Sequence, residues 1–302
     1  MTPGRGASIT TLRRRAALLA DMRAFFAARG VLEVDTASIC EAATPDPALN
    51  SMRVHGLSAS GYLHTSPEYM MKRLLAEGSG DIFQLCRVYR DGEVGTWHEP
   101  EFMLLEWYRV GYDEHELMSE VDELLSQLLS ERSLSRNAAR MTYDAALEHA
   151  LGVTSDSDTQ TLAQALIRHD IDVPEAISHD QALDLAMATV VGAGFAKDTL
   201  TFVYDYPVSQ AALAQINTGA KPRAARFEVF LGEMELGNGF RELTDAREQR
   251  ARFEQENAAR TAAGLDVAPI DDAFLAALEA GLPACAGVAI GFDRVLAAAL
   301  GA

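Results

Sequence analysis

The stretch FQLCRVYRDGEVGTWHEPEFMLLEWYR, residues 83–109, decides the fold class of this chain. Aromatic and β-branched residues on both sides of a charged loop predict two strands, with Arg90 at the start of the loop. A second stretch, GVAIGFDRVLAAAL at 287–300, predicts a strand that runs into a helix, with Arg294 at the junction. A guanidinium stays charged and donates in a planar fork that matches phosphate oxygens. We therefore expect the two arginines to converge on one polyphosphate.

Further strands lie on both sides of a helical block. Besides the last strand, strand patterns occur at 81–90, 101–112, 201–209, 225–232 and 233–240. The final two predict an antiparallel pair, and the polar, Ala-rich stretch 130–198 predicts a helical insertion. This order favours an α+β fold with a mostly antiparallel sheet flanked by helices over alternating βαβ units. We expect one domain over residues 1–302.

The composition restricts the classes of function. A net charge of -18 argues against broad binding of a nucleic-acid backbone, which requires a basic surface. No apolar run approaches the roughly 18 residues of a membrane span. The arginine-rich N-terminus has the apolar spacing of an amphipathic helix ending at Gly30, so we expect a structural helix and a cytoplasmic protein. Cys40, Cys86 and Cys285 lack metal-ligand spacing and are expected to be reduced, structural thiols.

The arginine segments suit the activation of a carboxylic acid by ATP, in which a carboxylate attacks the α-phosphate and pyrophosphate leaves. Arg90 can serve the α-phosphate, and Arg294 can serve the distal phosphates together with the N-terminus of its helix. Gly291 allows a nucleotide to approach the backbone closely. Glu235 is placed on a strand where it can hold Mg²⁺ between phosphates. Each residue alone is weak evidence, and the set together is strong.

A second set suits a cationic amino acid. Carboxylates and polar groups flank the arginines at Glu68, Glu106, Tyr108, Asn238 and Glu242. Glu106 and Tyr108 are two apart on one strand and therefore share a face. Several acids around one site repel each other unless a cation joins them, and a lysine-like ammonium would satisfy them. For any single acid, a solvated carboxylate in an acidic protein remains the alternative.

Three stretches together resemble the catalytic domain of class II lysyl-tRNA synthetases. They are SPEYMMKRLL, the opening stretch, and ELGNGFRELTDAREQRARFEQ with GVAIGFDR. A full synthetase of this type has an N-terminal OB-fold domain that reads the anticodon, for which this sequence offers no segment. The chain therefore resembles the stand-alone relatives, the elongation factor P (R)-β-lysine ligases. The resemblance implies ATP and Mg²⁺, a β-lysyl-adenylate, transfer of β-lysine to a lysine side chain of elongation factor P, and a homodimer, with tRNA not expected as the acceptor.

The resemblance, joined to the charge pattern, assigns the site residues. The expected amino-acid site comprises Ser66, Pro67, Glu68, Glu106, Tyr108, Asn238, Glu242 and Ala289. The expected ATP site comprises Arg90, Asp91, Gly92, Glu93, Glu99, Glu235, Leu236, Gly291 and Arg294. Arg90 and Arg294 are the expected catalytic residues, and Glu235 is the expected ligand of Mg²⁺.

One departure from the synthetases concerns the amino acid. Lysyl-tRNA synthetases usually have Gly-Leu-Gly where this chain has Gly287-Val288-Ala289. The extra methyl of Ala289 would reshape the region around the α-amino group, a change of about 1–3 kcal/mol in discrimination. The alternative is a neutral exchange in a strand.

A second departure concerns the nucleotide. The family's second motif reads Arg-x-Glu, whereas this chain has Arg90-Asp91-Gly92 followed by Glu93. Either Glu93 takes the role of the missing glutamate, or nucleotide affinity is reduced. Two other functions therefore stay open: a truncated lysyl-tRNA synthetase-like enzyme that activates α-lysine, and a catalytically weak amino-acid-binding regulator.

Overall fold

The computed structural model describes residues 8–56, 61–95 and 97–301. The chain divides into two compact units. The first contains Met1–Asp113 and Glu242–Ala302, and the second is Glu114–Arg241. Each unit is described by itself, and the expectation of a single domain stays a prediction.

The first unit is built on a sheet in the order β1-β5-β6-β12. Its strands are β1 (Leu32–Glu33), β5 (Ile82–Tyr89), β6 (Glu101–Val110) and β12 (Cys285–Gly291). β5, β6 and β12 are antiparallel neighbours, and only β1 runs parallel to its partner β5. The strands predicted in the opening stretch are confirmed to within two residues. Because Glu106 of β6 pairs with Ala289 of β12, segments far apart in the sequence share one sheet.

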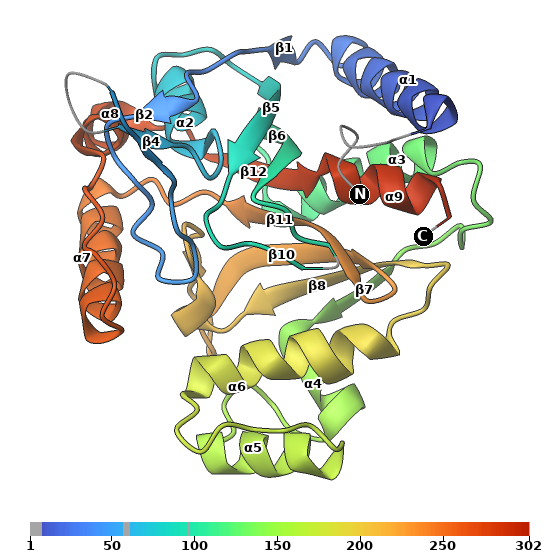
Figure 1. Ribbon diagram of the computed structural model, residues 1–302, viewed down its shortest axis with the longest axis vertical. Helices are drawn as coiled ribbons and strands as arrows, with labels where there is room; N and C mark the ends of the chain where they lie inside the picture. Colours follow the sequence, from blue (N-terminus) through green and yellow to red (C-terminus); the bar gives the residue numbers. More distant parts are fainter. Residues whose placement is uncertain (1–7, 57–60, 96, 302) are drawn as a thin grey trace. The chain divides into compact units, whose positions relative to one another are not determined.

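Five helices of the first unit are described. They are α1 (Ile9–Ala27), α2 (Glu68–Ala76), α7 (Ala246–Ala262), α8 (Asp272–Gly281) and α9 (Phe292–Ala299), which continues directly from β12 (Figure 1). A small sheet in the order β2-β4-β3 joins β2 (Ile39–Cys40), β4 (Gly61–Leu63) and β3 (Arg53–Val54). The predicted N-terminal helix is confirmed, since Ser8 caps α1 and Phe26 stacks on Phe83 of β5 at 4.4 Å between ring centres.

The second unit is a sheet in the order β11-β10-β8-β7, with β9 paired to β10. Its elements are α3 (Glu114–Leu128), β7 (Ala139–Thr142), α4 (Tyr143–Leu151), α5 (Thr159–Arg168), α6 (His179–Ala186), β8 (Leu200–Tyr206), β9 (Ile216–Asn217), β10 (Arg223–Leu231) and β11 (Met234–Arg241). The predicted antiparallel pair at β10 and β11 is confirmed. The stretch read as helical holds α4 to α6 and also the short strand β7, which pairs parallel with β8.

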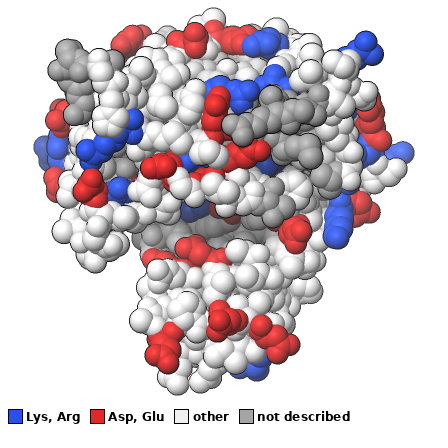
Figure 2. Space-filling view, viewed as in Figure 1, with Lys and Arg blue, Asp and Glu red and all other residues white. Residues whose placement is uncertain are grey.

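Charged residues are spread over the surface. Acidic and basic side chains lie interspersed over the face shown in Figure 2. Cys40, Cys86 and Cys285 are free thiols. Within the described parts of the chain, no helix combines the length and the apolar character needed to cross a bilayer.

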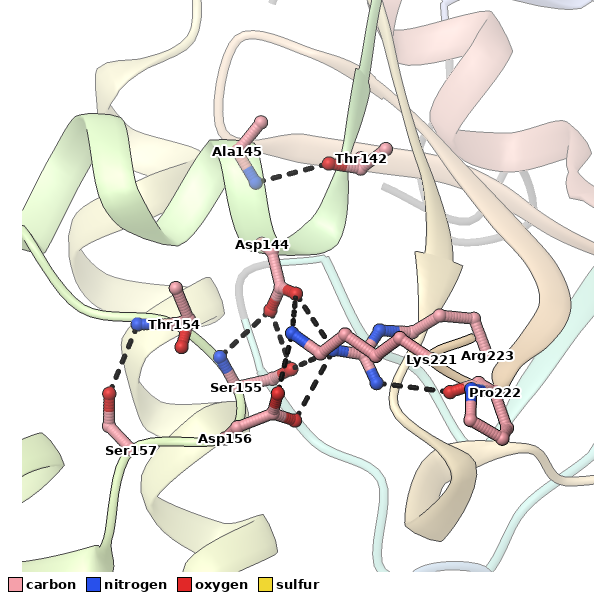
Figure 3. A network of polar contacts seen from close by, with 10 residues as sticks. All are labelled: Thr142, Asp144, Ala145, Thr154, Ser155, Asp156, Ser157, Lys221, Pro222 and Arg223. Carbon is pink, nitrogen blue, oxygen red and sulfur yellow. Dashed lines mark hydrogen bonds and ion pairs between the residues drawn. The ribbon is translucent and has the colours of Figure 1, made fainter. Parts of the chain in front are cut away.

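A polar network ties the helices of the second unit to its sheet (Figure 3). Asp144 of α4 accepts hydrogen bonds from Ser155, Lys221 and Arg223, at 2.6 to 2.7 Å from their side chains. Lys221 also lies 2.5 Å from a carboxylate oxygen of Asp156. Burial alone raises the pKa of Asp144, but these hydrogen bonds hold it well below its ordinary value. The network therefore joins α4, the 154–157 loop and the start of β10.

We expect Asp144→Asn to destabilise the protein by about 1–2 kcal/mol, a value reduced by the partial exposure of the site. Because the pKa of Asp144 is depressed, its contribution is present above about pH 3.9 and is lost as the pH falls below that value. Urea unfolding at pH 7 and pH 3 measures both effects. Asp172→Asn, at an exposed position, is the control. Equal losses for both variants at pH 7 would contradict this role.

Candidate active site

A buried lysine joins two of the predicted acidic residues. Lys72 lies one helical turn after Glu68 on α2, and its side chain is 0% exposed. Its Nζ donates to Glu68 Oε1 at 2.5 Å and forms an ion pair with Glu242 Oε2 at 2.6 Å. Burial alone lowers the pKa of Lys72, but Glu242 and Glu68 raise it above its ordinary value. The chain itself therefore supplies one ammonium to these acids, and a substrate ammonium at the same cluster stays a prediction.

The third acid of the cluster is Glu106, which is 3% exposed on β6. Tyr108 Oη donates to Glu106 Oε1 at 2.6 Å, which confirms that the two side chains share a face. Among the described residues, no group donates a hydrogen bond to Glu106 Oε2. Burial, with a smaller effect of Glu68, raises the pKa of Glu106 to about 8. Burial likewise raises the pKa of Glu242 to about 7. An additional cation near these groups would stabilise their charged forms.

Glycine is required opposite Tyr108. Gly287 of β12 pairs with Tyr108 of β6, and its N–H donates to the Glu242 carboxylate. A Cβ on Gly287 would lie 2.3 Å from Tyr108 Cε1 and 2.5 Å from Glu242 Oε1, far inside normal contact distance. The next residue on the same face of β12 is Ala289, which lies directly opposite Glu106. The structure thus places Ala289 beside the carboxylate cluster.

The turn before α2 brings the amino-acid residues next to Arg90. Pro67 caps α2, and the Glu68 N–H donates to Ser66 Oγ at 3.4 Å. Arg90 Nε donates to the backbone carbonyl of Thr65 at 3.4 Å, and its guanidinium stacks over a phenyl ring of β6 at 4.9 Å. Arg90 is therefore held at the start of its loop beside the turn that precedes α2.

Arg294 contacts the far part of the same loop. Its Nη2 lies 3.1 Å from His98 Nε2, and its Nε lies 3.5 Å from the Trp97 carbonyl. The structure therefore brings Arg90 and Arg294 to the loop that joins β5 to β6. A Cβ on Gly291, the cap of α9, would meet only the aliphatic part of Arg294 at ordinary contact distance, 3.5 Å. Packing alone does not require glycine there, and its part in the ATP site stays a prediction.

The loop between β5 and β6 holds the residues at which this sequence differs from the family's Arg-x-Glu motif. Gly92 has φ +78°, a conformation that an L-residue rarely adopts. Glu93, one place later, lies 3.4 Å from Arg90 Nη1, so it supplies the carboxylate next to this arginine. The Asp91 N–H donates to a backbone carbonyl of the 44–52 segment at 2.8 Å, and Glu99 lies half-buried just before β6.

The second unit carries the remaining predicted residues on β11. Leu236 is buried, whereas Glu235 and Asn238 are half-buried. Arg226 of β10 donates from Nε to Asn238 Oδ1 at 3.1 Å and from Nη2 to Glu228 Oε1 at 2.7 Å. The bond to Oδ1 fixes the amide so that its NH₂ group points away from Arg226. The charge of Glu235 contributes to a raised pKa of Glu228, so these two carboxylates lie near each other.

Three residues were not predicted. Lys72, Glu228 and Gln84 each lie beside a predicted site residue, and Gln84 of β5 pairs with Glu106 across the sheet. Gln84 is 1% exposed, and its amide atoms form no hydrogen bond within the described structure. The spacing of Lys72 four residues after Glu68 was the one signal in the sequence for any of them.

The predicted Mg²⁺ site at Glu235 has few protein donors around it among the described residues. Within the described residues, no three His, Cys, Asp or Glu side chains gather in a way that would hold a metal by themselves. Mg²⁺ commonly uses one or two protein carboxylates and takes its other ligands from substrate phosphates and water. Glu235 and Glu228 fit such a site, and Glu235 as the Mg²⁺ ligand stays a prediction.

We expect Gly287→Ala to destabilise the protein by about 1–3 kcal/mol, because the new methyl overlaps Tyr108 and Glu242. Chemical unfolding of the purified variant measures the loss. Gly194→Ala is the matched control, since a Cβ there meets no atom within 4 Å. A Gly287→Ala variant as stable as the wild type would contradict the geometry of this strand pair.

Comparison with known proteins agrees with this geometry. Residues 5–302 match the family model described as tRNA synthetases class II (D, K and N). A protein of Vibrio vulnificus (strain YJ016) is 47% identical over 305 residues, covering 98% of this chain and 93% of the relative. A protein of Salmonella arizonae is 45% identical over 307 residues, with the same two shares. Both relatives are named elongation factor P--(R)-beta-lysine ligase. The chain therefore belongs to the class II tRNA synthetase family of the D, K and N type.

Proposed function

We propose that this protein activates (R)-β-lysine with ATP and transfers it to a lysine side chain of elongation factor P in the cytoplasm. The observation that carries the proposal is the cluster of the buried Glu106 and Glu242 with the partly buried Glu68, which among the described residues holds one internal ammonium, that of Lys72. A cationic amino acid supplies a second ammonium to these three carboxylates. The names of the relatives support the choice of amino acid and acceptor.

The activation step joins the amino acid to the α-phosphate. A carboxylate oxygen of β-lysine attacks the α-phosphorus, the bond to the bridging oxygen breaks, and pyrophosphate leaves. Arg90, held beside the turn before α2, neutralises charge near the attacking carboxylate. Arg294, at the start of α9, serves the distal phosphates. When bound, Mg²⁺ would neutralise phosphate charge, and Glu235 together with Glu228 would be the residues that hold it.

The transfer step requires no protein nucleophile. The neutral ε-amine of the acceptor lysine attacks the carbonyl carbon of the adenylate, AMP leaves, and the new amide nitrogen loses its proton. The mixed anhydride already provides a good leaving group. In the second unit, Asn238, whose amide is oriented by Arg226, keeps an NH₂ group that can donate to a ligand.

Discrimination between lysine isomers is assigned to Ala289. This residue lies opposite Glu106, so its methyl takes space beside a carboxylate that recognises an ammonium. In β-lysine the amino group is on the β carbon instead of the α carbon, so its ammonium would occupy a different position relative to Glu106 and Ala289. A methyl group in the right place contributes about 1–3 kcal/mol to such a choice.

We further propose a homodimer through the N-terminal part of the first unit. Large apolar side chains are exposed there on α1 and on the segment that follows it, at Ile9, Leu12, Leu32 and Ile39. The family resemblance places a dimer interface at the same two segments, and a twofold dimer is the commonest oligomer. Covering these side chains would stabilise the pair.

We expect ATP–pyrophosphate exchange that depends on (R)-β-lysine, with a smaller response to α-lysine. Exchange reports adenylate formation without the acceptor. Failure with both isomers would contradict the enzymatic proposal, and ligand-induced thermal stabilisation without exchange would indicate a regulator. A strong preference for α-lysine, together with charging of lysine tRNA, would indicate the synthetase-like alternative.

We expect the KM for the amino acid to rise as the pH falls from 8 to 6. The pKa of Glu106 is about 8 and that of Glu242 is about 7, and each must lose its proton to bind an ammonium. An increase of roughly tenfold or more is expected. The pKa values of these carboxyls are raised on folding, so their contribution to stability is complete below about pH 4.5 and is lost as the pH rises through 7 and 8. A KM that is constant over this range would contradict the assignment.

A further inference from the structure

The ammonium of Lys72 lies at the centre of the carboxylate cluster. It is fully buried on α2, between Glu68 on its own helix and Glu242 on the chain that follows β11. Its Nζ also lies 5.8 Å from the ring centre of Phe274 on α8, so an aromatic face closes another side. The ammonium is thus enclosed by contacts from several elements.

The charge balance of the cluster depends on this ammonium. Among the described residues, the charged and titratable groups that interact with it are Glu68 of α2, Glu106 of β6, Glu242, and Cys285 of β12, and Tyr108 interacts with the three acids. Lys72 is the one cation of this set. Lys72 lowers the pKa of Glu106 and of Glu242, so without it these two acids would hold their protons to a higher pH.

The two ion pairs of Lys72 also fix the orientation of the Glu68 and Glu242 carboxylates. A lysine ammonium has three donors, and one of them binds Glu68 while another faces Glu242. The second oxygen of Glu242 lies beside Gly287, whose N–H donates to this carboxylate. With Lys72 and Gly287 on its two sides, Glu242 has one available orientation. Glu106 is held differently, by Tyr108, and keeps one oxygen without a hydrogen-bond donor in the described structure.

We propose that Lys72 is a positioning residue of the amino-acid site, a built-in counter-ion that orients Glu68 and Glu242 and offsets the repulsion among the acids that receive the substrate ammonium. The proposal rests on the proposed function, since it assigns the cluster to a cationic amino acid. Lys72 itself takes no part in the chemical steps. The site is thereby prepared for one further ammonium before any substrate arrives.

The test compares Lys72→Met with wild type in ATP–pyrophosphate exchange with (R)-β-lysine between pH 6 and pH 9. We expect the KM for the amino acid to rise at least roughly tenfold at pH 7, and its acidic limb to move upward by about one pH unit. The KM for ATP is expected to stay within about threefold, because the contacts of Lys72 described above are with Glu68, Glu242 and Phe274. Lys197→Met is the control, since it removes the same charge from an exposed position and should match wild type.

A folded Lys72→Met protein with an unchanged amino-acid KM and an unchanged pH profile would overturn the proposal. An active wild type is required first, so a wild type without exchange rejects the proposed function rather than the role of Lys72. For a Lys72→Met protein that does not fold, the double variant Lys72→Met with Glu242→Gln decides. It removes one charge from each side of the pair, and we expect it to fold and to show a cooperative thermal transition. A double variant that also fails to fold would overturn the proposal.

Discussion

The site of the first unit depends on burying three carboxylates around one ammonium. Burial of a single unpaired charge is costly, so the ammonium of Lys72 and the acids beside it are tolerated only together. The close packing of the cluster also restricts the residue type on β12. Position 287 must be glycine, because a side chain there would overlap Tyr108 and Glu242. The register of β5, β6 and β12 determines where Glu106 of the cluster lies. It places Glu106 between Gln84 of β5 and Ala289 of β12.

The two predicted phosphate-binding arginines of the first unit lie at one loop. Arg90 and Arg294 are far apart in the sequence, and both lie at the connection between β5 and β6. The carboxylate cluster suits an ammonium and the guanidinium groups suit phosphates, so the first unit has one region suited to a cation and another suited to an anion. Glu93 stands beside Arg90, and the positive φ of Gly92 lies in the turn between them.

Local residue patterns predicted much of this structure, and three-dimensional neighbours account for what they missed. The strands of the opening stretch were foreseen because aromatic and β-branched residues are concentrated there, and the pair at β10 and β11 was foreseen as well. β7 was missed, since four residues are too few to show a period. Lys72 has the residue type of a solvated surface group, and only the folded chain shows its second acid, Glu242, more than a hundred residues away. Glu228 likewise becomes a candidate only beside Glu235 of the next strand.

The central claim is that the cluster awaits an ammonium and ionises when it arrives. Isothermal titration calorimetry of (R)-β-lysine at pH 7, in buffers of different ionisation enthalpy, tests it directly. Glu106 and Glu242 hold protons near this pH, so we predict that binding releases protons into the buffer. The amino groups of the ligand are already charged at pH 7 and add no uptake. Binding with no proton release, or with net uptake, would contradict the account.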